Sequence, residues 1–240
     1  MYLGKRVEKK AVIPSPNWWD TPVQRASGFL KSTVSDMLKY AELFRTGGKV
    51  GDERILTNDS MKQMTEVHIW KNPIINQGYG YGLSVVPDYH GTRLVEHAGG
   101  IKGGGAQMYI IPEKGLTGIV LTNILSMAPT AIMNGIFNCM ENRAAEASYV
   151  IDENKSIGKE NLLEYIGNYQ SESMNLSLTV KLKGDQLQAY VLDSPIGLKP
   201  IHKDAFLLEG TMDDIQFNRN GHDRIIEIDF KGIKLRKEKE

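Results

Sequence analysis

The sequence predicts an α+β fold, in which an antiparallel sheet with flanking helices is followed by a small antiparallel β-barrel or β-sandwich. Three observations support this fold class. Tight turns separate apolar segments between residues 79 and 123, as in neighbouring antiparallel strands. A polar stretch interrupts the pattern at 151–158. Beyond it, short strand-like segments alternate with turn residues, which is typical of a barrel or sandwich.

Length and composition fit two modest domains. The chain has 240 residues, of which 41% are hydrophobic and 24% charged, an ordinary balance for a globular protein. Basic and acidic residues are equal at 29 each, so no global charge favours nucleic acid. We expect one domain over 1–150, a linker over 151–158 and a small β-barrel-like domain over 159–240.

The first helix is expected just after Ser32 and Thr33, either of which can serve as N-cap. A second short helix should begin near 57–59 and include Met61, Met64 and Val67. The glycine pair 47–48 ends the first helix. The apolar residues on one face of that first helix are Val34, Met37, Leu38, Ala41 and Phe44.

Strands and turns account for most of the remainder. Four strands are expected over 79–86, 93–97, 105–112 and 116–123, the last two joined by a tight turn at 112–115. A long helix over 129–147 follows. After the linker we expect a helix over 159–169. Six short strands follow it, over 176–182, 186–192, 197–200, 205–209, 214–218 and 224–230.

The single cysteine and the scattered histidines argue against a metal or other cofactor. Cys139 alone allows no intrachain disulfide and no Cys-based zinc site, and its apolar helical surroundings predict a buried structural thiol. The five histidines form no H-x-x-x-H pair. We therefore expect no bound metal and no cofactor.

No apolar run is long enough to span a membrane, and the basic residues 1–17, read as an irregular arm, lack the apolar core of a secretory signal. The sequence as written predicts a cytoplasmic protein. The aromatic pair Trp18 and Trp19 is expected to anchor or cover a loop.

The stretch EHAGGIKGGG, residues 96–105, is unusually rich in glycine. It matches neither G-x-x-x-x-G-K-[ST] nor a G-x-G-x-x-G that opens a helix, so it is not a phosphate cradle. In an extended strand Glu96 points to one face, while His97 and Gly99 point to the other. Two interpretations stay open: a glycine-rich sheet turn beside a surface histidine, or a strand left bare for a ligand.

Four segments resemble one known family. His97-Ala98-Gly99 resembles the H-x-G form of the third motif of serine β-lactamase-like and penicillin-binding proteins. Residues 26–37 resemble the family segment A-G-G-L-x-S-T-x-x-D-L, 79–83 its Y-G-Y-G-W segment and 116–123 its edge strand. They occur in the order and spacing of the family and cover about 26–147. The part after 159 resembles the small β-rich domain that often follows such hydrolases.

The resemblance implies a partial β-lactamase/transpeptidase-like domain and a substrate-binding role for three residues. His97 would be the polar or cationic side chain of the cleft, and Gly99 would keep the strand bare for substrate. The N–H of Gly100 would be an oxyanion donor. Substrates compatible with this strand are β-lactams, D-amino peptides and simple esters. Full-length relatives are often extracytoplasmic.

The other two family motifs are missing ahead of His97. The only S-x-x-K is Ser156–Lys159, which follows His97 within the polar linker. No Y-x-N occurs, and S-x-N occurs only at 15–17 and 173–175. We interpret these matches as chance, so we assign no catalytic residue. The resemblance then implies a C-terminal hydrolase region that is inactive alone.

Three hypotheses follow. The chain could be a truncated product of such a hydrolase, or it could complement a separately encoded N-terminal half, or self-associate, through an exposed sheet edge. It could instead be a non-catalytic module that binds a peptide, a glycan or another protein. It could also be a complete enzyme with an unrecognised nucleophile such as Ser27 or Ser84. A peptide or acyl small molecule is the expected ligand, and neither nucleic acid nor a membrane is an expected partner.

Overall fold

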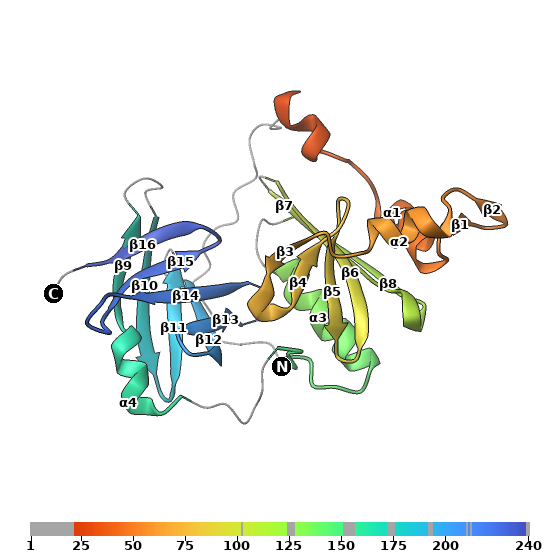
Figure 1. The fold of residues 1–240 in the computed structure, drawn as a ribbon. Coiled ribbons are helices and arrows are strands. Elements are labelled where there is room, and N and C mark those ends of the chain that lie inside the picture. Colours follow the sequence, from red (N-terminus) through yellow and green to blue (C-terminus); the bar gives the residue numbers. More distant parts are fainter. Residues whose placement is uncertain are drawn as a thin grey trace.

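The computed structural model contains a six-stranded antiparallel sheet with helices on both faces, and a closed eight-stranded antiparallel barrel (Figure 1). This confirms the predicted fold class and identifies the second part as a barrel, not a sandwich. The structure describes residues 22–101, 103–123, 128–150, 157–171, 176–191, 194–209, 211 and 213–238. The basic arm over 1–17 and the Trp18–Trp19 pair lie outside these residues.

The six strands of the sheet lie in sequence order, β3-β4-β5-β6-β7-β8. One predicted strand, 79–86, is wrong: it is two strands, β4 and β5, joined by a turn over 80–83 in which Gly82 has a φ of +74°. The bounds are β3 Ile69–Asn72, β4 Gln77–Tyr79, β5 Ser84–Tyr89, β6 Thr92–Ile101, β7 Gly104–Ile111 and β8 Leu116–Thr122. Short 3-10 turns lie at η2 Pro73–Ile75, after β3, and at η3 Pro112–Lys114, between β7 and β8.

Two helices cover one face of the sheet. Helix α1, Val34–Arg45, begins at the N-cap Thr33, whose hydroxyl accepts a hydrogen bond from the amide of Asp36. Helix α2, Asn58–Met64, begins after Thr57 in the same way. The prediction of a buried stripe on α1 is only partly right, because Ala41 and Phe44 are buried but Val34 and Leu38 are exposed. The 3-10 helix η1 Pro22–Ser27 precedes α1, and the hairpin β1 Lys49–Val50 with β2 Glu53–Arg54 separates α1 from α2.

Helix α3, Ala128–Met140, covers the opposite face and is shorter than the predicted 129–147. Its inward residues Met133 and Phe137 pack in a core with Tyr109 of β7. Cys139 is exposed, so the predicted buried thiol is wrong. The reason is the helical period: Met133 and Phe137, four residues apart, face the sheet, and Cys139 falls on the outer side.

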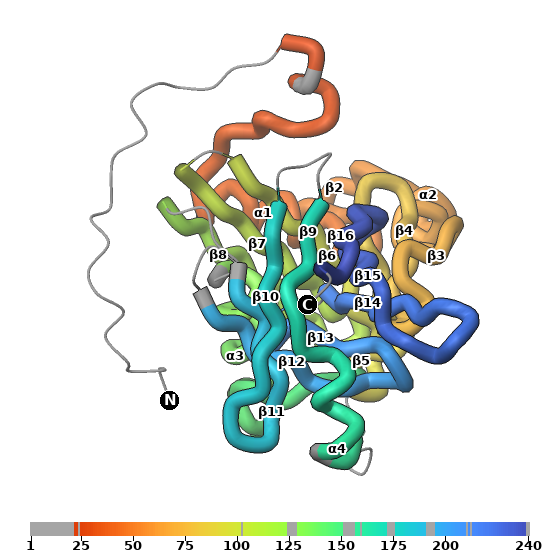
Figure 2. The backbone as a smooth tube through the Cα atoms, turned by 90° about the vertical axis from the view of Figure 1, so that its left-hand side faces the viewer, coloured from red at the N-terminus to blue at the C-terminus, as the bar shows by residue number. Residues whose placement is uncertain are grey.

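The barrel is preceded by the short helices α4 Lys159–Leu162 and η4 Leu163–Tyr165. Residues 167–169, predicted as helix, are the start of β9, and β9 pairs with β16 to close the barrel. Figure 2 shows the barrel strands in front of the sheet, and η1 standing off at one end. The strands are β9 Gly167–Ser171, β10 Leu176–Lys183, β11 Gln186–Val191, β12 Ser194–His202, β13 Ala205–Leu208, β14 Asp214–Arg219, β15 Ile225–Phe230 and β16 Ile233–Lys237.

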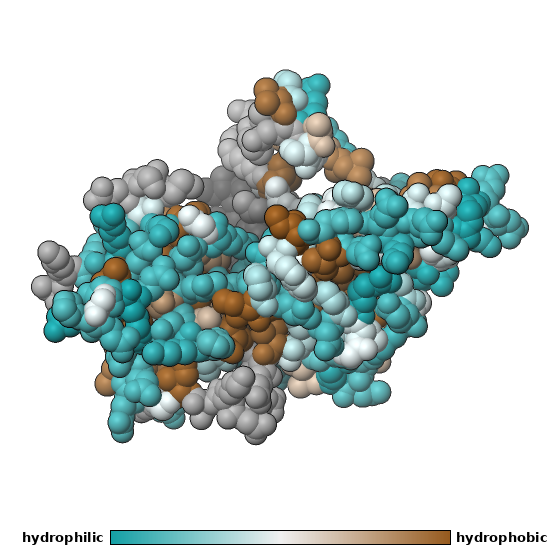
Figure 3. Space-filling view, viewed as in Figure 1, coloured by the Kyte–Doolittle hydropathy of each residue, from teal (hydrophilic) through white to brown (hydrophobic). Residues whose placement is uncertain are grey.

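Sheet and barrel touch through a small apolar cluster. Ile75 of η2 packs with Ile201 and Leu207 of the barrel, and Asn72 donates a hydrogen bond to Asp214. Apolar surface gathers where β3 and η2 approach the barrel (Figure 3). The proposed domain limits at 150 and 159 stay predictions, since 151–156 lie outside the described residues. Among the described residues no helix is long and apolar enough to cross a membrane.

A charged cluster anchors η4 to the barrel. Arg219 is 14% exposed and donates to Asp204 at 2.8 Å and to Glu164 at 2.7 Å. Tyr165 also donates to Asp204, at 2.8 Å. Burial raises the pKa of Asp204, but the hydrogen bonds from Arg219 and Tyr165 outweigh it and hold that pKa below its usual value. The ionised Asp204 therefore stabilises the folded barrel.

Arg219→Met should lower the free energy of unfolding by about 2–3 kcal/mol at pH 7, because Asp204 loses its cationic donor. Asp204 has a lower pKa in the folded protein than the value of about 3.9 that it has in the unfolded chain. The stability that this carboxylate contributes is therefore fully present above about pH 3.9, and it is lost as the pH falls through the pKa of the folded state. The deficit of the variant should therefore shrink below about pH 4. Urea unfolding at pH 7 and pH 3 measures both effects. A deficit that stays constant with pH would contradict the role of Asp204.

Candidate functional site

The glycine-rich end of β6 is open to solvent. His97, Ala98, Gly99 and Gly100 are all exposed, although the three residues just before them, Leu94 to Glu96, are buried. Leu94 packs in the core on the α3 side, and Val95 packs in the core on the α1 and α2 side. The predicted alternation therefore holds up to the site, and it places His97 and Gly99 on the α1 and α2 face.

Apolar surface continues from Gly99 across two neighbouring strands. The register pairs Gly99 with Ala106 of β7, and Ala106 with Leu121 of β8, so all three lie in one row on the His97 face. Leu121 is 42% exposed. A methyl group added at Gly99 would meet the Cβ of Ala106 at 3.4 Å, which is close but tolerable packing. The row forms a low apolar floor beside the bare strand.

An aromatic pair lies at the same end of the sheet. The rings of His68 and Tyr81 stack with centroids 4.4 Å apart, and His68 Nε2 lies 2.7 Å from the carbonyl oxygen of Gln63. Tyr81 is 58% exposed, in the turn between β4 and β5. Because Ser84 pairs with Glu96, this turn reaches the level of His97. Sequence reasoning missed Tyr81 because it placed the residue inside a strand; Gly80 and Gly82, on either side of it, were the available signal of a turn.

A buried polar network lies directly behind the site. Glu96 is 5% exposed and faces α3. Its carboxylate accepts hydrogen bonds from Gln77 at 3.2 Å and from Gln107 at 2.6 Å, and Gln107 accepts one from Thr130 at 2.9 Å. The network joins β4, β6, β7 and α3. It fixes the strand that presents His97 without itself reaching the exposed face.

The buried Tyr109 and the partly buried Tyr149, both near Glu96, are poorly suited to proton transfer. Burial, and then the charge of Glu96, raise the pKa of Tyr109 and of Tyr149 well above the usual value. Their hydroxyls stay protonated and donate to Asn134 and to the carbonyl of Ile75. The site therefore offers a polar imidazole, a bare strand and apolar walls for binding, but no general base from this part of the core.

Of the serines considered from the sequence, the two that the structure describes, Ser27 and Ser84, do not face His97. Ser84 is 3% exposed and pairs with Glu96, which places it on the α3 face. Ser27 lies in η1, which stands off from the sheet (Figure 1). Ser156 and the S-x-N matches at 15–17 and 173–175 lie outside the described residues. No group of three or more potential metal ligands gathers in the described part of the chain.

Comparison with known proteins finds one matching family model and several similar solved structures. The Beta-lactamase family model matches residues 4–136. No curated protein matches the sequence. Three solved structures are similar: an octameric penicillin-binding protein homologue from Pyrococcus abyssi (22% identity, TM-score 0.46, 85% of this chain and 46% of that chain), SurE with D-Leu (15%, 0.44, 86% and 50%) and SurE (16%, 0.45, 86% and 48%). The chain spans about half the length of these structures.

Glu96→Gln should destabilise the sheet by about 1–3 kcal/mol. Its new NH2 group would face the side-chain NH2 group of Gln77 or Gln107, so one of these donors would lose its acceptor. Thermal unfolding monitored by near-UV circular dichroism measures the change. Glu53→Gln, at an exposed position of the β1–β2 hairpin, is the matched control and should shift stability by less than about 0.5 kcal/mol. Equal shifts in the two variants would remove the special role of Glu96.

Proposed function

This chain belongs to the Beta-lactamase family, and we propose that it is the substrate-binding portion of a serine β-lactamase-like hydrolase that acts on amide or ester bonds. The observation that supports this most directly is the exposed end of β6, where His97 stands on the same face as the side-chain-free Gly99. An extended acyl substrate can lie against such a strand, because no Cβ blocks its approach.

Each of the three strand residues has a distinct proposed role. The imidazole of His97 binds a polar group or carboxylate of the substrate. Gly99 leaves room for the backbone of the substrate. The N–H of Gly100 donates to the oxygen on which negative charge develops as the acyl carbon is attacked, an interaction worth about 3 kcal/mol per donor. The exposed Leu121 and Tyr81 would contact apolar parts of the same substrate.

The nucleophile and its base are proposed to come from a separate N-terminal portion. No S-x-x-K or Y-x-N precedes His97 in the sequence, and a serine hydroxyl needs an adjacent base to attack an acyl carbon. Neither Ser27 nor Ser84 is presented beside His97. Alone, the chain would then bind substrate without acyl transfer.

A defined surface suits the docking of that portion. Strand β8, whose sequence LTGIVLT has no charged residue, is the last strand of the sheet, and its outer edge pairs with no strand among the described residues. Helix α3 beside it also lacks charged residues. Ile132, Ile136 and Met140, spaced four residues apart on α3, are 40%, 44% and 56% exposed. Uncharged edge strands and apolar helix stripes are normally covered. A second copy of the chain is the competing occupant.

The alternative function is a non-catalytic binding module for a peptide, a glycan or another protein. The observation in its favour is that the described part of the chain presents an open strand with an aromatic neighbour and no nucleophile beside it. Under both functions we place the binding site in residues 1–150 and treat the barrel, 159–240, as a separate domain.

The intact chain should not react with a fluorophosphonate probe, whereas a mixture with an N-terminal hydrolase segment that has S-x-x-K and Y-x-N should label that segment. Mass spectrometry of the probe adduct identifies the modified serine. Labelling of this chain alone would overturn the proposal in favour of a self-sufficient enzyme. No label in either sample, with saturable binding on a peptide or glycan array that His97→Ala abolishes, would favour the binding module.

The docking surface has its own control in that experiment. Ile136→Lys on α3 should reduce the labelled yield of the mixture, because it places a charge in the apolar stripe. Ser177→Lys, at an exposed position in the barrel, should leave the yield unchanged. If both variants behave like the parent chain, the N-terminal portion docks elsewhere.

Gly99→Ala separates folding from substrate contact. The added methyl fits at 3.4 Å from Ala106, so stability should change by less than about 0.5 kcal/mol. The same methyl stands where the substrate lies, so the rate of probe labelling in the mixture should fall at least about tenfold. Gly221→Ala, where a methyl would meet nothing, is the control. An unchanged labelling rate would place the acyl site away from Gly99.

A further inference from the structure

A pocket lies on the His97 face of the sheet, but at the opposite end of β6. Its cavity measures about 300 Å³, within the size range of small-molecule sites. Arg93 is six residues before Gly99 on an extended strand, so the two places are about 20 Å apart. The lining residues are Phe44, Arg45, Gly47, Asn58, Met61, Lys62, Thr65, Arg93 and Pro112.

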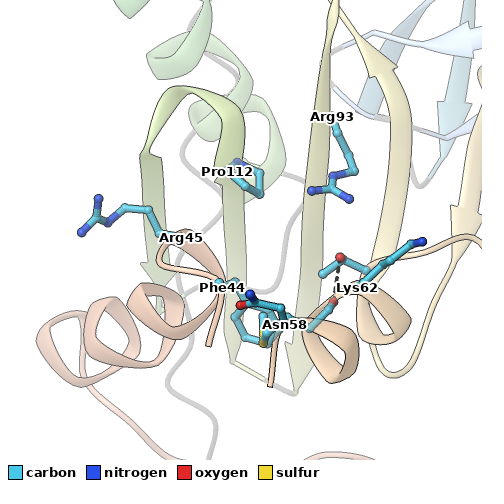
Figure 4. A pocket seen from close by; sticks show the side chains of 9 residues that line it. Phe44, Arg45, Asn58, Lys62, Arg93 and Pro112 are labelled. Carbon is cyan, nitrogen blue, oxygen red and sulfur yellow. Dashed lines mark hydrogen bonds between the residues drawn. The ribbon is translucent and has the colours of Figure 1, made fainter. Parts of the chain in front are cut away.

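The floor of the pocket is apolar. Phe44 of α1 and Met61 of α2 are 3% and 5% exposed and belong to one core cluster beneath the cavity. Pro112, at the start of η3, closes another side. The arrangement is seen in Figure 4, where the ring of Phe44 lies at the base and Pro112 lies opposite Arg93. A hydrocarbon group of a ligand can be buried here.

Arg93 supplies the polar recognition element. Figure 4 shows its guanidinium group directed into the space of the pocket. One nitrogen, Nη2, lies 3.2 Å from Glu113, whereas the buried Nε has no hydrogen-bond partner among the described residues. A buried N–H without an acceptor costs roughly 1–3 kcal/mol of desolvation, and a guanidinium has five N–H donors to satisfy. The buried Nε is out of reach of a ligand, but of the two terminal nitrogens only Nη2 has a partner among the described residues, so the end of the guanidinium that faces the pocket can still pair with a planar anion.

The remaining charges keep the pocket positive. Arg45 is engaged by Glu42 through a 2.7 Å hydrogen bond, and its head points away from the cavity in Figure 4. Lys62 stands at the rim and forms no ion pair with any residue that the structure describes. The pocket is lined by three cations, Arg45, Lys62 and Arg93. Because Glu42 pairs with Arg45 and Glu113 pairs with Arg93, the charge of Lys62 is left uncompensated.

We propose that this pocket is a second ligand site, which binds a small organic carboxylate with an apolar body. The two oxygens of a carboxylate match adjacent N–H donors of Arg93, since such fork-to-fork pairing is the geometry that guanidinium groups favour. The apolar body rests on Phe44 and Met61, and Lys62 adds attraction at the rim. This site does not depend on the hydrolase function proposed for the other end of β6.

Titration of the intact chain with 3-phenylpropionate, followed by isothermal calorimetry or by amide chemical shifts, tests the proposal. We expect saturable binding with a Kd near 1 mM, and binding at least about tenfold weaker for the neutral 3-phenylpropionamide. Inorganic phosphate should also bind at least about tenfold more weakly, because it lacks the apolar body. Equal binding of the amide or of phosphate, or no saturable binding of the carboxylate, would overturn the proposal.

Two variants with opposite expected effects distinguish binding from structural support. Arg93→Met should weaken 3-phenylpropionate binding at least about tenfold. Glu113→Gln should tighten it about threefold, because the half-exposed Glu113 carboxylate competes for Arg93. Arg236→Met, at an exposed position in the barrel, is the control and should change nothing. If Glu113→Gln binds 3-phenylpropionate with unchanged or lower affinity, the proposed role of Arg93 is contradicted. This outcome is decisive even if Arg93→Met fails to fold.

Discussion

The register of β6 depends on one buried carboxylate. Glu96 is enclosed on the α3 side of the sheet, where Gln77 and Gln107 donate to it. A slip of one residue would turn that charge toward α1 and α2 and would exchange the faces of His97 and Ala98. Such a slip leaves a buried carboxylate without donors, which costs several kcal/mol. The exposure of His97 and Gly99 on a single face is thus a consequence of where Glu96 is held.

The same alternation explains why the two ends of β6 differ. Between Leu94 and Glu96 every side chain is covered, by α3 on one face and by α1 and α2 on the other. Beyond Glu96, alanine and glycine follow His97, so there is no large side chain left for a helix to cover. The strand continues to Ile101 because backbone pairing with β7 supports it, not because its side chains pack. An open strand end is what a ligand-binding surface requires, and it arises from composition alone.

The prediction from the sequence succeeded where local patterns decide the structure. The N-cap at Thr33, the alternation along β6 and the turn at 112–115 each depend on residues close together in the chain. It failed where long-range contacts decide. Residues 167–169 became a strand because β16 is available to pair with them, and the pocket around Arg93 is assembled from α1, α2, β6 and η3. Tyr81 was missed for one local and one long-range reason. Its flanking glycines were a local signal of a turn, but only the pairing of Ser84 with Glu96, which is a long-range contact, brings that turn level with His97.

The spacing along β6 also limits how its two ends could influence one another. Arg93 lies four residues before His97, about 13 Å away along the extended strand, which is more than one Debye length at physiological salt, so the charge of an anion at Arg93 is largely screened from His97. A direct electrostatic effect on the imidazole is therefore small. Coupling would therefore pass through packing, and the available route is the core cluster that Phe44 and Met61 share with Val95 and Met108. Met108 pairs directly with His97, so a ligand that shifts α1 or α2 against the sheet would reach the site through this residue. The core between the helices and β6, not the field of the charges, is the element through which occupancy at one end could be sensed at the other.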